Sequence, residues 1–157
     1  MSERIYLETS IVSYLAARPS RDLVTAARQQ LTHEWWARRR PVFDIFISEL
    51  VVAEAAAGNP DAAERRAQLL QDLPLLNISE EATALARTLM RTVGLPSGAG
   101  ADALHIALAA WHGMDYLLTW NSAHIANAEL RPKVERACRE RGYEPPVLCT
   151  PDELMGD

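Results

Sequence analysis

The sequence lacks several features that identify common protein classes. Its 157 residues include two cysteines, Cys138 and Cys149, whose positions show no paired spacing. We interpret them as structural thiols of a protein from a reduced compartment. No apolar run approaches the length of a bilayer span, and the N-terminus has no basic segment followed by an apolar one. We therefore expect a soluble, cytoplasmic protein with no membrane association.

Lysine is almost absent, and the motifs of several enzyme classes are missing. Lys133 is the only lysine and lies in a helix-like segment near the end of the chain. A phospho-aspartyl phosphatase or a receiver domain would instead need a lysine at the end of a strand. The sequence also contains no Walker loop, no dinucleotide-binding glycine motif and no Gly-x-Ser-x-Gly nucleophile elbow.

Basic residues are fewer than acidic ones, 16 against 21, and the formal net charge is −5. This balance argues against binding of nucleic acid by bulk charge alone. The arginines cluster at 38–40 and at 65–66, where charge patterning favours solvated helix faces. Trp35 and Trp36 precede the first cluster and could stack on bases, or could form a pair that is half core and half interface. We expect the two tryptophans to belong to a protein interface rather than to a surface that stacks on RNA bases.

Apolar residues make up 48% of the chain, and their spacing predicts alternating strands and helices. Strands are expected at 4–8, 42–47, 74–78, 115–120 and 147–149. Helices are expected at 11–15, 22–39, 49–57, 61–73, 79–89, 102–111, 123–129 and 132–141, with Ser10 and Ser48 as N-caps. This alternation predicts an α/β fold, a three-layer α/β/α domain over residues 1–157 with a central, mainly parallel sheet of four or five strands.

Oxygen-bearing side chains occur near several of the predicted strand-to-helix junctions. Glu8 closes the first strand, Glu54 lies in the helix after the second, Asp102 opens a helix and Asn121 follows a late strand. Open α/β sheets place their ligands at the carboxyl ends of strands. Four oxygen ligands from four such junctions can converge on one hard divalent cation.

Other interpretations compete at these positions. Asp102 can serve as a helix N-cap or first-turn residue, and Glu49 competes with Glu54 but suits the helix dipole as a first-turn acid. The histidines of the helix at 102–111 and its end, His105 and His112, are interpreted as core or surface residues. His124 is expected near the rim of the site.

Four segments of the chain carry a family resemblance. They are Tyr-Leu-Glu-Thr-Ser at 6–10, the Ser-led segment ending in Glu at 48–54, Asp-Ala-Leu-His-Ile-Ala-Leu-Ala at 102–109, and the segment ending in Thr-Trp-Asn at 115–121. In this order they resemble the motifs of PIN-domain ribonucleases of the VapC toxin type. The family usually has Asp at the positions of Glu8 and Asn121.

The resemblance implies a PIN-like fold and a metal-dependent endoribonuclease, a hydrolase that cleaves RNA by attack of metal-bound water. The implied cofactor is Mg²⁺ or Mn²⁺. It also implies the toxin of a toxin–antitoxin pair, acting as a homodimer and neutralised by a small antitoxin protein. The implied metal-binding and catalytic residues are Glu8, Glu54, Asp102 and Asn121, with Ser10 and Thr119 as the residues that position them.

A second function remains open on the same residues. Glu8 is one methylene longer than the usual Asp, and Asn121 removes one negative charge. These departures also suit a catalytically weak or inert PIN-like module that binds RNA or protein. Metal-dependent cleavage of RNA by the purified protein would distinguish the endoribonuclease from the binding module.

Overall fold

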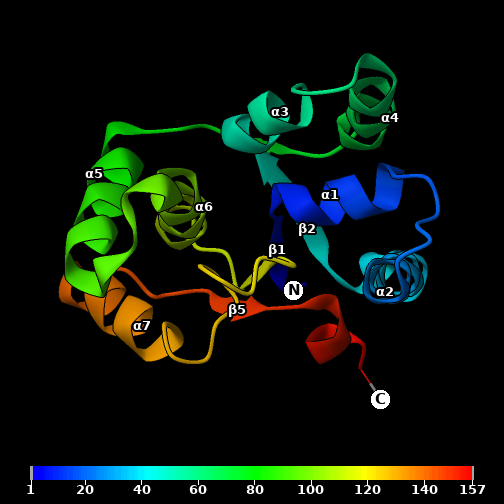
Figure 1. Ribbon diagram of the computed structural model, residues 1–157. Helices are drawn as coiled ribbons and strands as arrows, with labels where there is room; N and C mark the ends of the chain where they lie inside the picture. Colours follow the sequence, from blue (N-terminus) through cyan, green and yellow to red (C-terminus); the bar gives the residue numbers. More distant parts are fainter. Residues whose placement is uncertain (1, 157) are drawn as a thin grey trace.

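The computed structural model describes residues 2–156, and its centre is one five-stranded sheet (Figure 1). The strand order is β3-β2-β1-β4-β5, and every neighbouring pair is parallel. The prediction of a central parallel sheet is confirmed. The strands are β1 (Arg4–Leu7), β2 (Asp44–Ser48), β3 (Leu75–Leu76), β4 (Tyr116–Leu118) and β5 (Val147–Cys149).

Helices flank the sheet in two groups (Figure 1). In one group α1 packs against α2, α3 and α4, and in the other α5 packs against α6 and α7. Within residues 2–156, no helix is both long and apolar enough to cross a bilayer. The helices are α1 (Thr9–Ala16), α2 (Leu23–Arg39), α3 (Glu49–Ala55), α4 (Pro60–Leu70), α5 (Glu80–Leu89), α6 (Gly100–Trp111) and α7 (Arg131–Glu140).

The central strand β1 forms the middle of the core. Ile5, Tyr6 and Leu7 are fully buried, as expected for a strand covered on both faces of a parallel sheet. Because β1 pairs with β2 on one side and β4 on the other, the carboxyl ends of these three strands lie at one edge. The helices α1 and α3 begin directly at that edge.

Two helix N-caps at this edge differ in how well the sequence predicts them. Ser48 caps α3 as expected, since its Oγ accepts a hydrogen bond from the Val51 amide at 3.2 Å. The prediction of Ser10 as the cap of the first helix is wrong. Glu8 takes that position, and its carboxylate accepts the Ser10 amide at 3.1 Å. The first helix therefore begins two residues earlier than predicted.

The helix predicted at 123–129 is absent, and the segment is a series of turns instead. Side-chain oxygens take the amide hydrogens that a helix would use. Asn121 Oδ1 accepts from the His124 amide at 3.0 Å, and Asn127 Oδ1 accepts from the Glu129 amide at 2.9 Å. Asn side chains that bond nearby backbone groups in this way compete with helix formation.

Trp35 belongs to the core rather than to an interface, so the prediction for that residue is wrong. Its side chain is fully buried and stacks on Phe43 with a centroid distance of 6.1 Å. Trp36 is half-buried, with the Arg40 guanidinium 4.2 Å from its ring centroid.

The pair at 65–66 also departs from the predicted solvated face. Arg65 donates to the carbonyl of Ala16 at 2.9 Å, and Arg66 donates to the carbonyl of Ala55 at 2.8 Å. Both guanidinium groups therefore join neighbouring helices.

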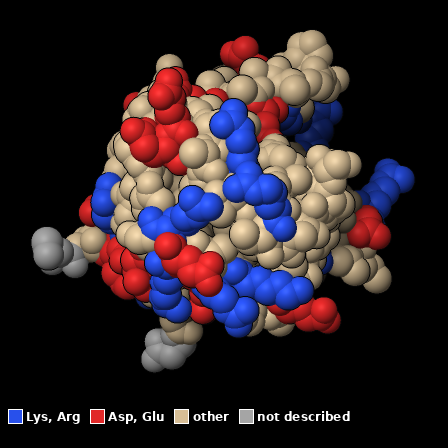
Figure 2. Space-filling model, turned by 90° about the vertical axis from the view of Figure 1, so that its left-hand side faces the viewer, with Lys and Arg blue, Asp and Glu red and all other residues tan. Residues whose placement is uncertain are grey.

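The face that displays α5 and α7 carries charges of both signs (Figure 2). On α7, Arg139 lies 3.8 Å from the Glu135 carboxylate and 3.1 Å from that of Glu144. Proteins that bind nucleic-acid backbones present surfaces dominated by basic groups. The mixed charge of this face does not match that pattern.

Candidate metal centre

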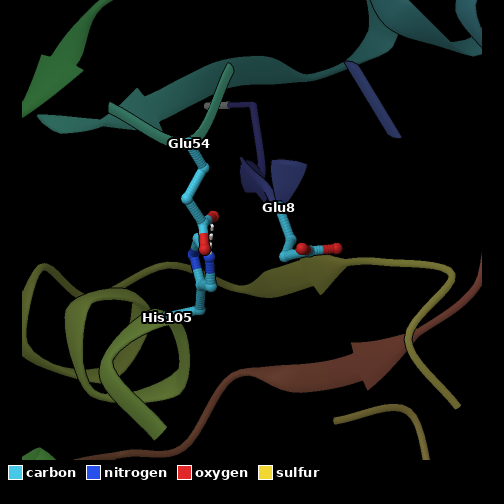
Figure 3. A group of neighbouring side chains, drawn as sticks. All are labelled: Glu8, Glu54 and His105. Carbon is cyan, nitrogen blue, oxygen red and sulfur yellow. Dashed lines mark hydrogen bonds and ion pairs between the residues drawn. The ribbon is translucent and has the colours of Figure 1, made fainter. Parts of the chain in front are cut away.

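Three side chains from three elements converge at the carboxyl edge of the sheet. Glu8 follows β1, Glu54 lies on α3 and His105 lies on α6. One ligand atom of each, a carboxylate oxygen or an imidazole nitrogen, lies within 4.8 Å of the other two. Figure 3 shows Glu54 and His105 directed toward one another, with Glu8 beside them. Two carboxylates and one imidazole form a donor set that fits a divalent cation.

Glu8 is buried and held in one orientation by hydroxyl groups. Its Oε1 accepts hydrogen bonds from Ser10 Oγ at 2.5 Å and from Thr119 Oγ1 at 2.6 Å, besides the Ser10 amide. Within residues 2–156, every hydrogen bond to this carboxylate engages Oε1. The second oxygen, Oε2, is therefore the one available to a cation.

Glu54 is held by two donors of its own. Its Oε1 accepts from Thr9 Oγ1 at 2.5 Å and contacts His105 Nε2 at 2.7 Å. Partial burial alone would raise the pKa of this carboxyl, but the hydrogen bonds from His105 and Thr9 and the charge of His105 outweigh it. The pKa of Glu54 is lowered as a result, which favours the carboxylate form that a cation requires.

His105 is fully buried, and its ring is fixed from behind by two hydroxyl groups. Its Nδ1 lies 2.7 Å from the Tyr6 hydroxyl, which lies 2.7 Å from Ser48 Oγ. Burial raises the pKa of Tyr6 far above its ordinary value, so the hydroxyl keeps its proton. Nε2 is thereby directed at Glu54.

Asp102 and Asn121 form a second group that includes His124. Asp102 Oδ1 accepts from Asn121 Nδ2 at 3.0 Å, and Asp102 Oδ2 lies 2.9 Å from His124 Nδ1. Thr119 joins the two groups, because its Oγ1 accepts from the Asn121 amide at 2.9 Å while donating to Glu8. Two of the four predicted ligands, Glu8 and Glu54, therefore converge with His105. The other two, Asp102 and Asn121, form a hydrogen bond with each other.

The structure gives His105 a part in the site that the sequence does not predict. His105 was interpreted as a core or surface residue; it is buried, but it also contacts Glu54. Its position three residues after Asp102 places both on one side of α6, which is the signal that could have identified it. His124 lies beside Asp102, at the place where a rim residue was expected.

The comparisons with known proteins agree with this architecture. The chain belongs to the PIN-domain family, whose model matches residues 5–130. Among solved structures it resembles VapC20 of Mycobacterium tuberculosis, described as a sarcin–ricin loop cleaving toxin, with a TM-score of 0.57, 18% identity, and coverage of 72% of this chain and 86% of that one. No curated protein sequence matches the chain significantly.

A second solved structure has the same fold. It is VapBC2 of Rickettsia felis bound to a DNA fragment from its promoter, with a TM-score of 0.52 and 21% identity. The match covers 76% of this chain and 89% of that one. At these identities the likeness concerns the fold, and it confirms the predicted resemblance to PIN domains of the VapC type.

Proposed function

We propose that this chain is a divalent-metal-dependent endoribonuclease that hydrolyses RNA phosphodiesters. The observation that carries the proposal is the convergence of Glu8 and Glu54, with His105, at the carboxyl edge of the sheet. Membership of the PIN-domain family, and a fold shared with a toxin that cleaves the sarcin–ricin loop, support the same activity.

In this proposal Glu8 and Glu54 hold the cation, Mg²⁺ or Mn²⁺. A bound divalent cation would neutralise the charge of a phosphodiester and lower the pKa of water. Ser10 and Thr119 keep the Glu8 carboxylate in place, and Thr9 does the same for Glu54. The residues thus supply a site whose negative groups are oriented before the cation arrives.

Asp102 and Asn121 complete the proposed site beside the cation. Their mutual hydrogen bond and the contact of Asp102 with His124 fix both side chains, and Thr119 connects them to Glu8. In this position Asp102 adds negative charge and Asn121 adds a neutral amide. We expect them to orient the phosphodiester and water rather than to replace Glu8 or Glu54.

The biological setting is part of the same proposal. We infer that residues 1–157 act as one domain, that the protein is the toxin of a toxin–antitoxin pair, and that it forms a homodimer. The VapC-type resemblance supports these inferences. Co-expression with the product of the neighbouring gene tests the partner: a stable complex that suppresses cleavage is expected, and free, fully active toxin would contradict it.

Cleavage of RNA by the purified protein tests the activity. We expect cleavage with Mg²⁺ or Mn²⁺, none with a chelator, and loss of at least about 100-fold in Glu8→Gln and Asp102→Asn, about 3 kcal/mol of lost stabilisation. Glu140→Gln, which removes an exposed carboxylate on α7, serves as the matched control. Full activity in Glu8→Gln would refute the assignment.

A second candidate, a weak or inert binding module, is supported by one observation. The acids of the site already have protein partners: Glu54 contacts His105, and Asp102 contacts His124 and Asn121. These contacts stabilise the carboxylates without a cation. RNA binding without cleavage at any divalent metal concentration would favour this candidate.

A further inference from the structure

His105 has a place in the candidate metal centre that the acidic motifs do not account for. It is fully buried at the carboxyl edge of the sheet, and its Nε2 lies 2.7 Å from Glu54 Oε1. The imidazole therefore makes a polar contact with a carboxylate of the site and does more than fill core space. The same nitrogen belongs to the group of three ligand atoms with Glu8 and Glu54.

The groups behind the imidazole are those that a metal-binding histidine needs. Such a histidine nearly always uses its second nitrogen in a hydrogen bond that fixes the ring. Here Nδ1 lies 2.7 Å from the Tyr6 hydroxyl, and the next contact in the chain of hydroxyls is Ser48 Oγ at 2.7 Å. Ser48 is itself fixed by the Val51 amide at the start of α3.

Hydroxyl groups also make this support compatible with either neutral tautomer of the ring. A hydroxyl can donate one hydrogen bond and accept others. Tyr6 can therefore donate to Nδ1 while Nε2–H donates to Glu54. It can equally accept from Nδ1–H and donate to Ser48, which leaves the lone pair of Nε2 for a cation.

We propose that His105 Nε2 is a direct ligand of the cation held by Glu8 and Glu54, oriented by Tyr6 and Ser48, and that this nitrogen makes the site prefer Mn²⁺ to Mg²⁺. The inference rests on the metal site of the proposed function and adds its selectivity. Both ions favour oxygen ligands, but Mg²⁺ demands near-ideal octahedral geometry and retains its waters, whereas Mn²⁺, a first-row transition metal, accepts an imidazole nitrogen more readily. Replacing one oxygen ligand by a nitrogen therefore favours Mn²⁺.

Pulsed electron paramagnetic resonance of the Mn²⁺-loaded wild-type protein tests the ligand directly. We expect modulation from a coordinated nitrogen, lost in His105→Gln and retained in His112→Gln. His112 is the C-cap residue of the same helix and contacts the Asn77 carbonyl instead. A wild-type spectrum without nitrogen modulation would overturn the inference by itself, whether or not the variants fold. Modulation lost in His124→Gln but kept in His105→Gln would also overturn it.

Calorimetric titration tests the selectivity. We expect Mn²⁺ to bind the wild type more tightly than Mg²⁺, and Tyr6→Phe to weaken Mn²⁺ binding by about 10- to 100-fold with a smaller effect on Mg²⁺. Equal losses for both metals would overturn the proposed selectivity, because Tyr6 would then act only on the fold.

The two proposals fail in different ways. Cleavage that depends on metal, together with a spectrum free of nitrogen coupling, would remove His105 from the ligand set and leave the nuclease intact. Absence of binding by Mn²⁺ and by Mg²⁺ would remove the metal site itself, and both proposals with it.

Discussion

Ser48 performs two tasks with one hydroxyl group. Its Oγ caps α3 through the Val51 amide and also contacts the buried Tyr6 hydroxyl. Ser79 offers a comparison, because its Oγ caps α5 through the Ala82 amide at 3.0 Å and makes no second hydrogen bond among the described residues. The difference between the two serines isolates the contribution of the Tyr6 contact.

We expect Ser48→Ala to destabilise the protein by more than Ser79→Ala. Loss of a serine cap costs about 1 kcal/mol, and loss of the buried hydrogen bond to the Tyr6 hydroxyl, which keeps His105 Nδ1 as a partner, costs about 0.5–1.5 kcal/mol more. Urea unfolding of both variants measures the difference. Equal losses would show that the Tyr6–Ser48 contact adds nothing to stability.

Asn121→Asp tests the neutral residue of the site. Asn121 Nδ2 donates to Asp102 Oδ1 at 3.0 Å, so an aspartate there would set two carboxylates against each other. We expect a lower midpoint of unfolding without metal and a lower metal concentration for half-maximal cleavage. Unchanged metal affinity in calorimetry would place Asn121 outside the influence of the cation.

Sequence patterns indicated that Glu8 and Glu54 belong to the site, but they did not indicate that His105 contributes to it. An acid that ends an apolar strand, and an acid within a Ser-capped helix, can be read from local context. α6 is apolar around most of its surface, with Ala103, Ile106 and Ala107 all fully buried. Such a helix has no polar face to assign. The spacing of Asp102 and His105 shows only that the two residues share one side of α6. The contact of His105 with Glu54 depends on packing between segments that are distant in the sequence.

At the scale of elements, the strands were predictable and one helix was not. Short apolar runs between turn signals correctly predicted all five strands, although each of β1 to β4 is shorter than predicted and only β5 has the predicted bounds. The segment at 123–129 has a composition that suits a helix. Asn121 and Asn127 instead bond the backbone nearby and stabilise turns. That competition is decided by individual side-chain contacts rather than by apolar spacing.

The cysteines of α7 and β5 predict how stability depends on alkaline pH. Burial raises the pKa of Cys138 to about 11 and that of Cys149 to about 12, from an ordinary value of 9.0. The folded state therefore keeps thiol protons that the unfolded chain releases above pH 9. Their contribution is complete below pH 9 and declines as pH rises toward 11 and 12.

We expect the free energy of unfolding to fall above pH 9 less steeply in a Cys138→Ala, Cys149→Ala variant than in the wild type. Urea titrations at pH 8, 9 and 10 give the slopes. In the same series, a thiol reagent at pH 8 should react with both cysteines only after unfolding. Identical slopes in the two proteins, or rapid labelling of the native state, would contradict the burial argument.

At the scale of the whole molecule, strand order explains how the site is assembled. β1 lies between β2 and β4, so residues near positions 8, 54 and 105 meet although they are far apart in sequence. A cation bound there would contact Glu8 after β1, Glu54 on α3 and His105 on α6, and would so connect three separate elements. Its binding should therefore stabilise the fold as a unit.

Divalent metal should raise the midpoint of thermal unfolding. A ligand that binds only the folded state adds about 2.7 kcal/mol at a hundredfold excess over its dissociation constant. We expect a clear shift with Mn²⁺, a smaller one with Ca²⁺, and neither in a Glu8→Gln, Glu54→Gln variant. An equal Mn²⁺ shift in that variant would point to binding elsewhere.

The most direct test of the account is an anomalous-diffraction map of crystals soaked in Mn²⁺. The account predicts one strong peak at the carboxyl edge of the sheet, within bonding distance of carboxylate oxygens of both Glu8 and Glu54. A map from well-ordered crystals with no peak at that edge, or with Mn²⁺ bound only at other residues, would contradict the central claim that these two acids form the metal centre.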